Sequence, residues 1–389
     1  MDKEWLMIPG PTPIPPQVQM AASQPMISHR GKAFSCLYEE IQTNLREIFG
    51  TNEEILIFPA AGTGAMEASI VNLFSEGDHV LCLDTGEFGR RYKDIGEAFG
   101  LQVETLSFPL GRPVDPKVVE DRLAKDDKKS IRGILLTHNE TSAGVTNDLK
   151  AVSGAVGEHP AFLIVDAVSS LGALPVKMDE WGLDVVISGS QKALMSPPGL
   201  ALAALSARAW AQTEKAGLPR YYWDFRRAKA YAEKKQTPYT PAVSLLFGLN
   251  AALKSLTEQG MEKIYDQQAV IGKAFRAGIR ALGLELVARP GSESDTVTAI
   301  FSPAGLCADQ WRKEVENKWH VVTAKGQGQL AGKIIRVGHM GFIDPLDILS
   351  VLGALEMSLG ITDKDKHESN AIKAAQKVLA EGGLRKTCE

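Results

Sequence analysis

Residues 183–199, LDVVISGSQKALMSPPG, form an apolar run that leads into a small polar turn carrying Lys192. Upstream, residues 161–167, AFLIVDA, form a second apolar run, which ends at Asp166. Runs that are apolar throughout, rather than alternating, are typical of strands buried on both faces, as in a parallel sheet covered by helices. We therefore expect Lys192 and Asp166 to lie at strand ends in an α/β protein.

Over about residues 35–205, short apolar runs of this kind alternate with helical patterns. This alternation predicts a large domain with a mostly parallel, seven-stranded sheet between helices. The expected strands are Ile55–Phe58, His79–Leu83, Val103–Leu106, Gly133–Thr137, Phe162–Val165, Val185–Ser188 and Leu200–Ala204. Helical patterns between them include Ala65–Phe74, Arg91–Phe99 and Pro116–Ala124.

This alternation of apolar runs and helical patterns stops near Ser244, where a long helix begins. We expect residues 18–250 to form the large domain, and residues 1–17 and 251–389 to form an N-terminal arm and a smaller α+β domain. The arm should be extended over Ile8–Pro16, because its prolines remove hydrogen-bond donors and fix the backbone. The small domain should contain strands and end in two helices, with strands at Leu284–Val287, Val297–Phe301 and Lys333–Val337 and the last helix at about Glu368–Leu379.

Composition excludes several classes of protein. The chain has 389 residues, 44% of them hydrophobic and 23% charged, and a net charge of −4, as in an ordinary soluble protein. It has no basic run, which argues against nucleic acid as a partner. No apolar run approaches the ~20 residues of a membrane span, and the first residues lack the apolar segment of a signal peptide. The 4 cysteines are scattered, so we expect no structural metal and a cytoplasmic location.

Lys192 and Asp166 are the pair of side chains that pyridoxal 5′-phosphate (PLP) needs. The lysine amine forms a Schiff base with the cofactor, and the carboxylate keeps the pyridine nitrogen protonated. Each residue alone has an ordinary alternative, because a strand-end lysine is usually a solvated loop residue and a strand-end aspartate usually a turn or cap residue. The prediction therefore depends on the other side chains expected at the same edge of the sheet.

Four further features fit a cofactor site at that edge, since open α/β sheets bind ligands beyond the carboxyl ends of their strands. The loop at residues 60–67, AAGTGAME, opens a helix and suits a phosphate. Phe88 could stack on a planar ring or be a core residue. Ser142 could donate to the ring's phenolate oxygen, whereas its neighbour His138 fits a turn residue better. Arg336 lies in an apolar strand, where it could bind a carboxylate or form a structural ion pair.

On these residues the chain resembles a class V aminotransferase of PLP fold type I. It is most similar to the alanine/serine–glyoxylate (or –pyruvate) aminotransferase group. The resemblance spans nearly the whole chain, and its matching motifs are PGPTP (9–13), GTGAME (62–67), HNETSAG (138–144), VDAVSSLG (165–172), SGSQKAL (188–194) and RVGHMG (336–341).

The resemblance implies a role for each matching residue. Lys192 would carry the PLP and Asp166 would pair with its pyridine nitrogen, and these two would be the catalytic residues. Arg336 and Gly10 would bind the substrate. The remaining cofactor contacts would come from Ala61, Gly62, Thr63 and Gln191 at the phosphate, Ser142 at the ring oxygen, Phe88 and Val168 on the two ring faces, and Thr240 of the partner subunit. Position 61 is alanine where relatives often have serine, and position 88 is phenylalanine where they often have tryptophan.

The implied activity is ping-pong transamination in a homodimer with shared active sites. The expected donor is alanine or serine, and the expected acceptor is glyoxylate or pyruvate. An aspartate or phosphoserine aminotransferase is an alternative if one of Arg30, Arg90, Arg91, Arg226 or Arg227 holds a second anionic group. A cysteine desulfurase is disfavoured, because Phe88 stands where that group has histidine and Cys307 resembles a helix start. A non-catalytic subunit that kept the fold is disfavoured by the presence of both Lys192 and Asp166.

Overall fold

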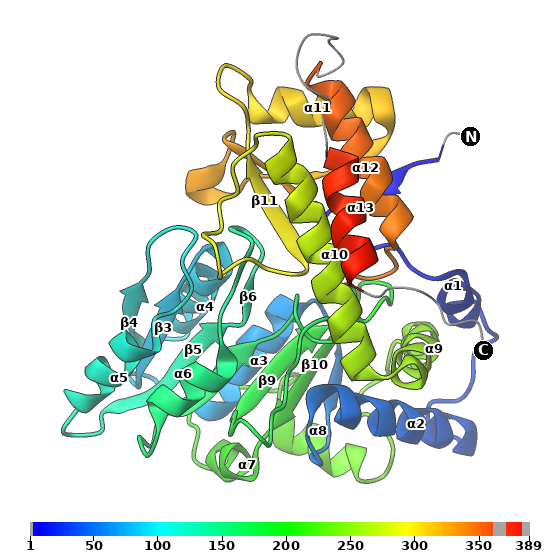
Figure 1. The fold of residues 1–389 in the computed structure, drawn as a ribbon. Coiled ribbons are helices and arrows are strands. Elements are labelled where there is room, and N and C mark those ends of the chain that lie inside the picture. Colours follow the sequence, from blue (N-terminus) through cyan, green and yellow to red (C-terminus); the bar gives the residue numbers. More distant parts are fainter. Residues whose placement is uncertain (1–2, 361–370, 383–389) are drawn as a thin grey trace.

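The computed structural model describes residues 3–360 and 371–382, and it contains the expected seven-stranded sheet (Figure 1). The strand order is β2-β10-β9-β8-β5-β3-β4. Six strands run parallel, whereas β10 is antiparallel to both of its neighbours, β2 and β9. All seven predicted strands are confirmed, with the bounds β2 Leu56–Pro59, β3 His79–Asp84, β4 Gln102–Ser107, β5 Ile131–Thr137, β8 Phe162–Asp166, β9 Val185–Gly189 and β10 Leu200–Leu205.

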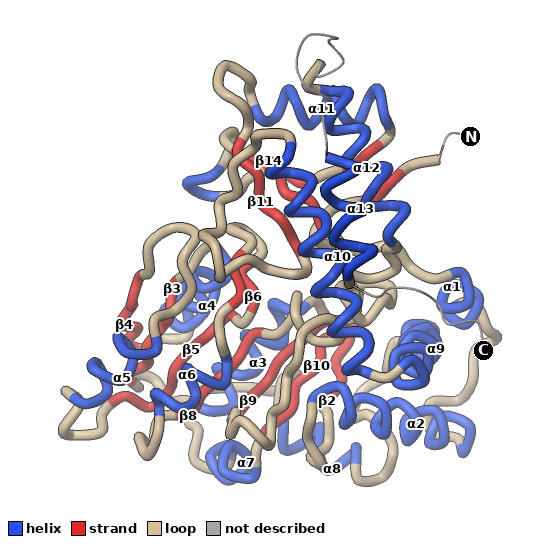
Figure 2. Tube along the Cα trace, in the orientation of Figure 1, coloured by secondary structure: helices blue, strands red, loops and turns tan. Residues whose placement is uncertain are grey.

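Helices cover both faces of the sheet (Figure 2), so most of the strands are buried on both sides, whereas the edge strand β4 is partly exposed. Alternate residues of one strand enter different cores: Ile187 packs with the helices of one face, and Val186 with those of the other. The first face carries α3 (Gly62–Leu73), α4 (Glu87–Ala98), α7 (Ala207–Thr213) and α8 (Phe225–Ala232). The second face carries α2 (Lys32–Phe49), α5 (Pro116–Ala124), α6 (Leu149–Val156) and α9 (Val243–Gln259). This burial explains the absence of polar alternation in the strand sequences.

A smaller unit with its own core follows α9. Its sheet has the order β11-β14-β13 and is antiparallel throughout. The core is built around the fully buried Trp311. The elements are α10 (Met261–Ala281), β11 (Val297–Phe301), α11 (Ala308–Trp319), β12 (Val321–Val322), β13 (Ala324–Lys325), the 3-10 helix η1 (Gly328–Leu330), β14 (Ile334–Gly338), α12 (Pro345–Ser358) and α13 (Ala371–Glu381). Two terminal helices are confirmed; the predicted start of the last one, Glu368, lies outside the described residues.

The predicted strand at Leu284–Val287 is wrong. The segment lies beside β11 and exchanges only two backbone hydrogen bonds with it, Phe301 N to Glu285 O at 2.9 Å and Val287 N to Ala299 O at 3.0 Å. This leaves one isolated bridge, between Leu286 and Ile300, rather than a ladder. The domain boundary at residue 250 stays a prediction; residue 250 falls inside α9.

The N-terminal arm is extended as expected, with α1 (Pro16–Ala22) beginning at its last proline. Its start is held by the small unit: β1 (Trp5–Leu6) pairs with β12 in parallel, and Gly338 N donates to Met7 O at 2.8 Å. The arm then crosses to the carboxyl edge of the large sheet, where Thr12 N donates to Gln191 O at 3.1 Å. The arm therefore connects the two units at the place where the candidate site lies.

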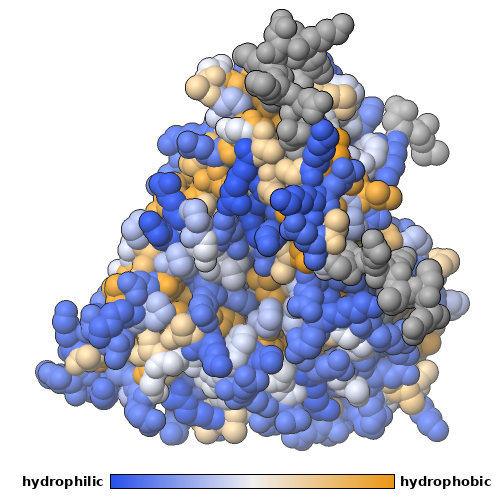
Figure 3. Space-filling view, in the orientation of Figure 1, coloured by the Kyte–Doolittle hydropathy of each residue, from blue (hydrophilic) through white to orange (hydrophobic). Residues whose placement is uncertain are grey.

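None of the helices that the structure describes is long and apolar enough to cross a membrane. The face shown in Figure 3 is largely hydrophilic, and its hydrophobic residues are scattered between polar ones.

Candidate active site

Most of the predicted site residues come from five places at the carboxyl edge of the large sheet, whereas Gly10 lies in the arm, Arg336 in β14 and Thr240 just before α9. Asp166 is the last residue of β8 and pairs in register with Thr137 of β5 and Ile187 of β9. Lys192 follows the end of β9 after a short turn. The remaining residues at this edge come from the loops after β2, β3 and β5. Because parallel strands end at the same edge, residues far apart in sequence meet there.

Lys192 is held against the N-terminal arm. Its Nζ donates a hydrogen bond to Pro9 O at 2.7 Å, and its own carbonyl accepts one from Thr12 Oγ1 at 2.9 Å. The arm has glycine at position 10, where a Cβ atom would lie 2.5 Å from Lys192 Nζ. Gly10 is therefore required for the arm to pass this close to the amine. Burial, together with the nearby charge of Arg336, lowers the pKa of the Lys192 amine to about 8.

The lowered pKa predicts how fast the amine reacts with an aldehyde. Only the neutral amine is a nucleophile, and a pKa of about 8 makes it available well below the ordinary range of lysine. We expect the rate of covalent PLP attachment to the cofactor-free protein to rise with pH and to level off above about pH 8. Stopped-flow absorbance between neutral and alkaline pH measures this. A rate that keeps rising through the ordinary lysine pKa would contradict the expectation.

Asp166 is a buried carboxylate at the end of β8. Its Oδ1 accepts a hydrogen bond from Val168 N at 2.9 Å. Burial raises the pKa of Asp166 to about 6, and the charge of Glu140 adds to the rise, whereas Lys192 and Arg91 oppose it. A buried carboxylate of raised pKa gains from a protonated nitrogen placed beside it. This is the environment that a pyridinium ring requires.

The loop after β2 forms an uncapped helix start. Ala61 is the N-cap residue of α3, and it provides no side-chain hydrogen bond to the helix. Gly62 brings this loop against Val168, since a Cβ atom there would lie 2.6 Å from Val168 Cγ2. Nearby, Gln191 Oε1 is buried and has no hydrogen-bond partner among the described residues. Free helix N–H groups and the Thr63 hydroxyl are together suited to a phosphate, and Gln191 would contribute through its Nε2 hydrogens, because its Oε1 can only accept.

Phe88 lies at the start of α4 with Arg91 one turn further on. The Arg91 guanidinium lies over the Phe88 ring, 4.6 Å from its centroid, and its Nη1 lies 3.4 Å from Thr63 Oγ1. The i, i+3 spacing on α4 places both side chains on one helix face. Arg91 therefore lies between the Phe88 ring and the loop after β2, and it adds a cation beside that loop.

Ser142 and Glu140 follow β5 in the short hairpin of β6 (Asn139–Glu140) and β7 (Val145–Thr146). The Ser142 hydroxyl donates to Glu140 Oε1 at 2.5 Å and accepts from Glu87 N at 3.1 Å. The neighbouring polar residues serve the structure: Asn139 Nδ2 donates to Ser169 Oγ at 2.8 Å, and burial lowers the pKa of His138 to about 3.

Arg336 is buried and has no ion-pair partner among the described residues. Its Nε donates to Lys325 O at 2.9 Å, and its Nη1 donates to Thr141 O at 3.0 Å. Burial lowers the pKa of Arg336 to about 10, although the charge of Glu140 opposes the shift. Both hydrogen-bond acceptors are neutral, so the cation is not neutralised by direct contact. A structural ion pair, the ordinary alternative for this arginine, is therefore not observed in the described chain.

The structure does not bring Thr240 together with these residues. Thr240 is exposed, and it lines a surface cavity of 380 Å³ together with Met26 and His29. Of the other arginines, only Arg91 contacts a predicted site residue. Four are engaged elsewhere: Arg30 by Thr237 O, Arg90 by Asp84 and Glu87, Arg226 by Asp224 and Glu214, and Arg227 by the rings of Tyr221 and Tyr239.

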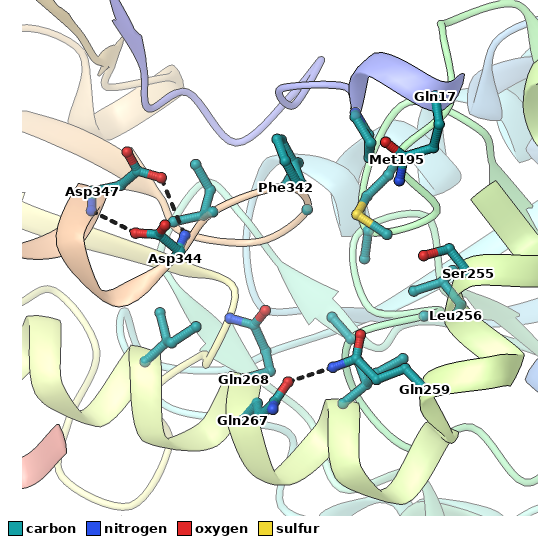
Figure 4. A pocket seen from close by; sticks show the side chains of 18 residues that line it. Gln17, Met195, Ser255, Leu256, Gln259, Gln267, Gln268, Phe342, Asp344 and Asp347 are labelled. Carbon is teal, nitrogen blue, oxygen red and sulfur yellow. Dashed lines mark hydrogen bonds between the residues drawn. The ribbon is translucent and has the colours of Figure 1, made fainter. Parts of the chain in front are cut away.

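A separate cavity of 270 Å³ lies behind the lysine loop (Figure 4). Ala193 and Met195, which follow Lys192 in the chain, contribute to its wall. The rest of its wall includes Phe342, the end of α9 and the first turns of α10, where Gln259 Nε2 of α9 donates to Gln267 Oε1 of α10 at 2.5 Å. No group of three or more potential metal ligands occurs in the part of the chain that the structure describes.

Sequence reasoning gave no role to Glu140 or the backbone of Pro9, and it named Arg91 only as one of five arginines that could hold a second anionic group. A signal existed for two of them, since Glu140 lies inside the same motif as Ser142, and Arg91 is one helical turn from Phe88. The contact between the Pro9 carbonyl and Lys192 had no signal in the sequence other than the adjacent glycine, Gly10.

Comparisons with known proteins agree with this geometry. The family model "Aminotransferase class-V" matches residues 6–326. The soluble hydrogenase 42 kDa subunit of Anabaena cylindrica is 40% identical over 381 residues, which cover 97% of this chain and 99% of that protein. The serine–glyoxylate aminotransferase of Methylorubrum extorquens is 37% identical over 393 residues, covering 99% and 98%.

A solved structure shows the same architecture. The pyridoxamine–pyruvate aminotransferase from Mesorhizobium loti superposes with a TM-score of 0.92, at 28% identity, over 98% of each chain. The matched family covers most of the chain, and its residues include the whole lysine loop. The protein therefore belongs to the class-V aminotransferases, PLP-dependent transaminases of fold type I.

Proposed function

We propose that this class-V aminotransferase transfers the amino group of a small amino acid, alanine or serine first, to glyoxylate or pyruvate. Arg336 is the observation that carries the proposal. It is a buried guanidinium that donates to two neutral carbonyls and has no ion pair in the described chain. Its charge lowers the pKa of the Lys192 amine, so the two groups lie close enough to interact electrostatically. A carboxylate placed there would receive the planar two-point contact that arginine offers.

The residues present fit PLP, which supplies an electron sink for the bond that breaks at the substrate's Cα. The uncapped start of α3, Thr63 and Gln191 would hold its phosphate. Lys192 would anchor it and then, once its amine is released, carry the proton at Cα. Asp166 would hold a proton on the ring nitrogen. Arg336 would fix the substrate carboxylate and so orient the Cα–H bond relative to the ring.

The substrate pair is tested by a matrix of amino donors against glyoxylate, pyruvate and 2-oxoglutarate, with keto-acid formation as the measurement. We expect alanine or serine with glyoxylate or pyruvate to give the highest kcat/KM. A strong preference for aspartate or glutamate would favour the alternative in which Arg91, the cation beside Phe88, holds a distal carboxylate. Sulfide release from cysteine without amino transfer would instead indicate a desulfurase. The position of Cys307, exposed at the start of α11, argues against that reaction.

The relative named as a hydrogenase subunit raises a second candidate, a protein that assembles with other chains without turnover. The lowered pKa of Lys192 and the unpaired charge of Arg336 argue against it, because both are costly features that a purely structural subunit does not need. Purified protein loaded with PLP distinguishes the two, since only the aminotransferase converts an amino donor to its keto acid.

The proposed unit is a homodimer in which each active site uses both chains. Around Thr240 the surface is unusually aromatic and apolar: Met26 is 68% exposed and Tyr221 70% exposed, and Tyr239 stacks on Tyr222. Such a patch is typical of a covered surface. Thr240 would reach the phosphate of the partner subunit's cofactor from this patch.

Mixed dimers test the shared site. The Lys192→Ala chain lacks the cofactor anchor, and the Thr240→Ala chain lacks the proposed contact to the partner subunit's phosphate. If Thr240 acts across the interface, one of the two sites in a mixed dimer receives both defects and the other receives none, so mixing should restore up to about half of the wild-type activity per mixed dimer. Subunit exchange followed by activity measurement gives the result. Full activity in a monomer, or no recovery after confirmed exchange, would contradict the proposal.

A further inference from the structure

Glu140 is a buried carboxylate in the site that the proposed transamination leaves without a role. It is fully inaccessible to solvent, and four hydrogen bonds converge on it. Its Oε2 accepts from Phe88 N at 3.0 Å and from Gly89 N at 3.2 Å. Its Oε1 accepts from Ser142 N at 3.0 Å and from the Ser142 hydroxyl at 2.5 Å. These bonds fill the acceptor capacity of one carboxylate.

The Ser142 hydroxyl has one hydrogen, and two acceptors would compete for it: the Glu140 carboxylate and the ring oxygen of bound PLP. In the structure that hydrogen goes to Glu140, while Ser142 Oγ accepts from Glu87 N at 3.1 Å. If Ser142 donates to a ring oxygen of bound PLP, the same hydrogen must leave Glu140. Two oxygens 2.5 Å apart would then face each other with no hydrogen between them. An ionised carboxylate in that arrangement would lose its strongest hydrogen bond and gain a repulsion.

Among the described residues, the only side chain that donates a hydrogen bond to Glu140 is that of Ser142. Position 86 is glycine, and a Cβ atom there would lie 2.5 Å from Ser142 Oγ and 2.6 Å from Glu140 Cδ, so the loop closes tightly over the pair. The Glu87 carboxylate is already paired with Arg90. A proton from solvent is therefore the remaining way to restore the contact. Once protonated, Glu140 Oε1 would donate to Ser142 Oγ, which has a second lone pair free to accept.

Charged groups of both signs act on Glu140, so neither its ionised nor its protonated form is held by one sign of charge alone. Asp166 faces it from β8, and Glu140 raises the pKa of that residue. Arg336 faces it from β14, and Glu140 raises the pKa of that residue as well. The start of α4 contributes backbone N–H groups. Burial raises the pKa of Glu140 itself, while its hydrogen bonds to Ser142, Gly89 and Phe88 oppose the rise.

We propose that Glu140 and Ser142 form a proton-sharing pair, in which Glu140 takes up a proton from solvent when Ser142 turns its hydroxyl hydrogen toward the ring oxygen of bound PLP. The inference rests on the proposed function, because it needs a cofactor oxygen in front of Ser142. Glu140 acts through Ser142 and is a positioning residue. Its negative charge is present in the empty site and is removed in the loaded one.

Calorimetry measures the proton directly. The cofactor-free protein is titrated with 4-deoxypyridoxine 5′-phosphate, which keeps the ring oxygen and the phosphate but has no aldehyde to react with Lys192. Titrations in two buffers of different ionisation enthalpy at neutral pH give the number of protons taken up. We expect wild type to take up about one proton more per site than Glu140→Gln or Ser142→Ala, because neither variant can transfer a proton to this pair.

Ser130→Ala is the matched control. The Ser130 hydroxyl also donates to a carboxylate, Asp126 Oδ1 at 2.8 Å, but outside the site, so this variant should match wild type. If Glu140→Gln fails to fold, Ser142→Ala decides the question alone. If wild type and Ser142→Ala both bind the analogue and take up the same number of protons per site, the proposal of a proton-sharing pair is wrong, while the proposed function stays intact. Failure of the wild-type protein to bind the analogue would overturn the cofactor assignment, and the pair with it.

Discussion

Lys192→Ala is expected to abolish amino transfer and to remove the visible absorbance band of covalently bound cofactor. The amine is the only group that the structure places at this point with a pKa low enough, about 8, to serve both as the anchor and as the base at Cα. Loss of a positioned general base alone costs about 10²–10⁴-fold, and the covalent anchor is lost at the same time. Turnover should therefore fall on the order of 10⁴-fold or more. Absorbance spectra and keto-acid formation measure the two effects separately.

Lys254→Ala is a suitable control, because Lys254 pairs with Glu40 on the surface and should leave both signals unchanged. Normal turnover by Lys192→Ala, or cofactor that borohydride reduction fixes covalently to that variant, would show that the lysine is wrongly assigned.

Arg336→Ala is expected to weaken the amino donor and the keto acceptor equally, because both present the same carboxylate. Removing a two-point, charge-assisted contact costs about 2–3 kcal/mol, which is roughly a hundredfold in kcat/KM. Steady-state kinetics on each half-reaction test this. Arg336→Lys keeps the charge but loses the planar fork, so it should fall between wild type and the alanine variant. An effect on only one of the two substrates would contradict the assignment.

The large sheet was predictable because burial on both faces leaves a direct mark in the sequence. Strands such as Leu200–Leu205 are apolar throughout, which is the pattern expected of a short strand covered on both faces. Lys192 and Asp166 were predictable for a related reason, since polar residues directly after such strands must lie at the ligand-binding edge.

The strand prediction that failed and the site residues that were missed depended on tertiary contacts, which a sequence does not display. Residues 284–287 have a strand's composition, yet only two hydrogen bonds join them to β11. Glu140 was passed over because carboxylates are expected at the surface, and its four donors come from two separate loops. The hydrogen bond from Lys192 to Pro9 joins residues 183 positions apart, which no local pattern can reveal.

The last of these contacts constrains how the molecule is made. The arm is synthesised long before its binding sites, which are β12, the turn after β9 and the end of β14. Closing so long a loop costs chain entropy before any contact repays it, so the arm should dock late, after both units have formed. Until then Lys192 lacks the carbonyl that holds its amine. A nascent chain could thus complete its sheet on the ribosome while its chemistry waits for the small unit, and the arm acts as a check that both halves are present.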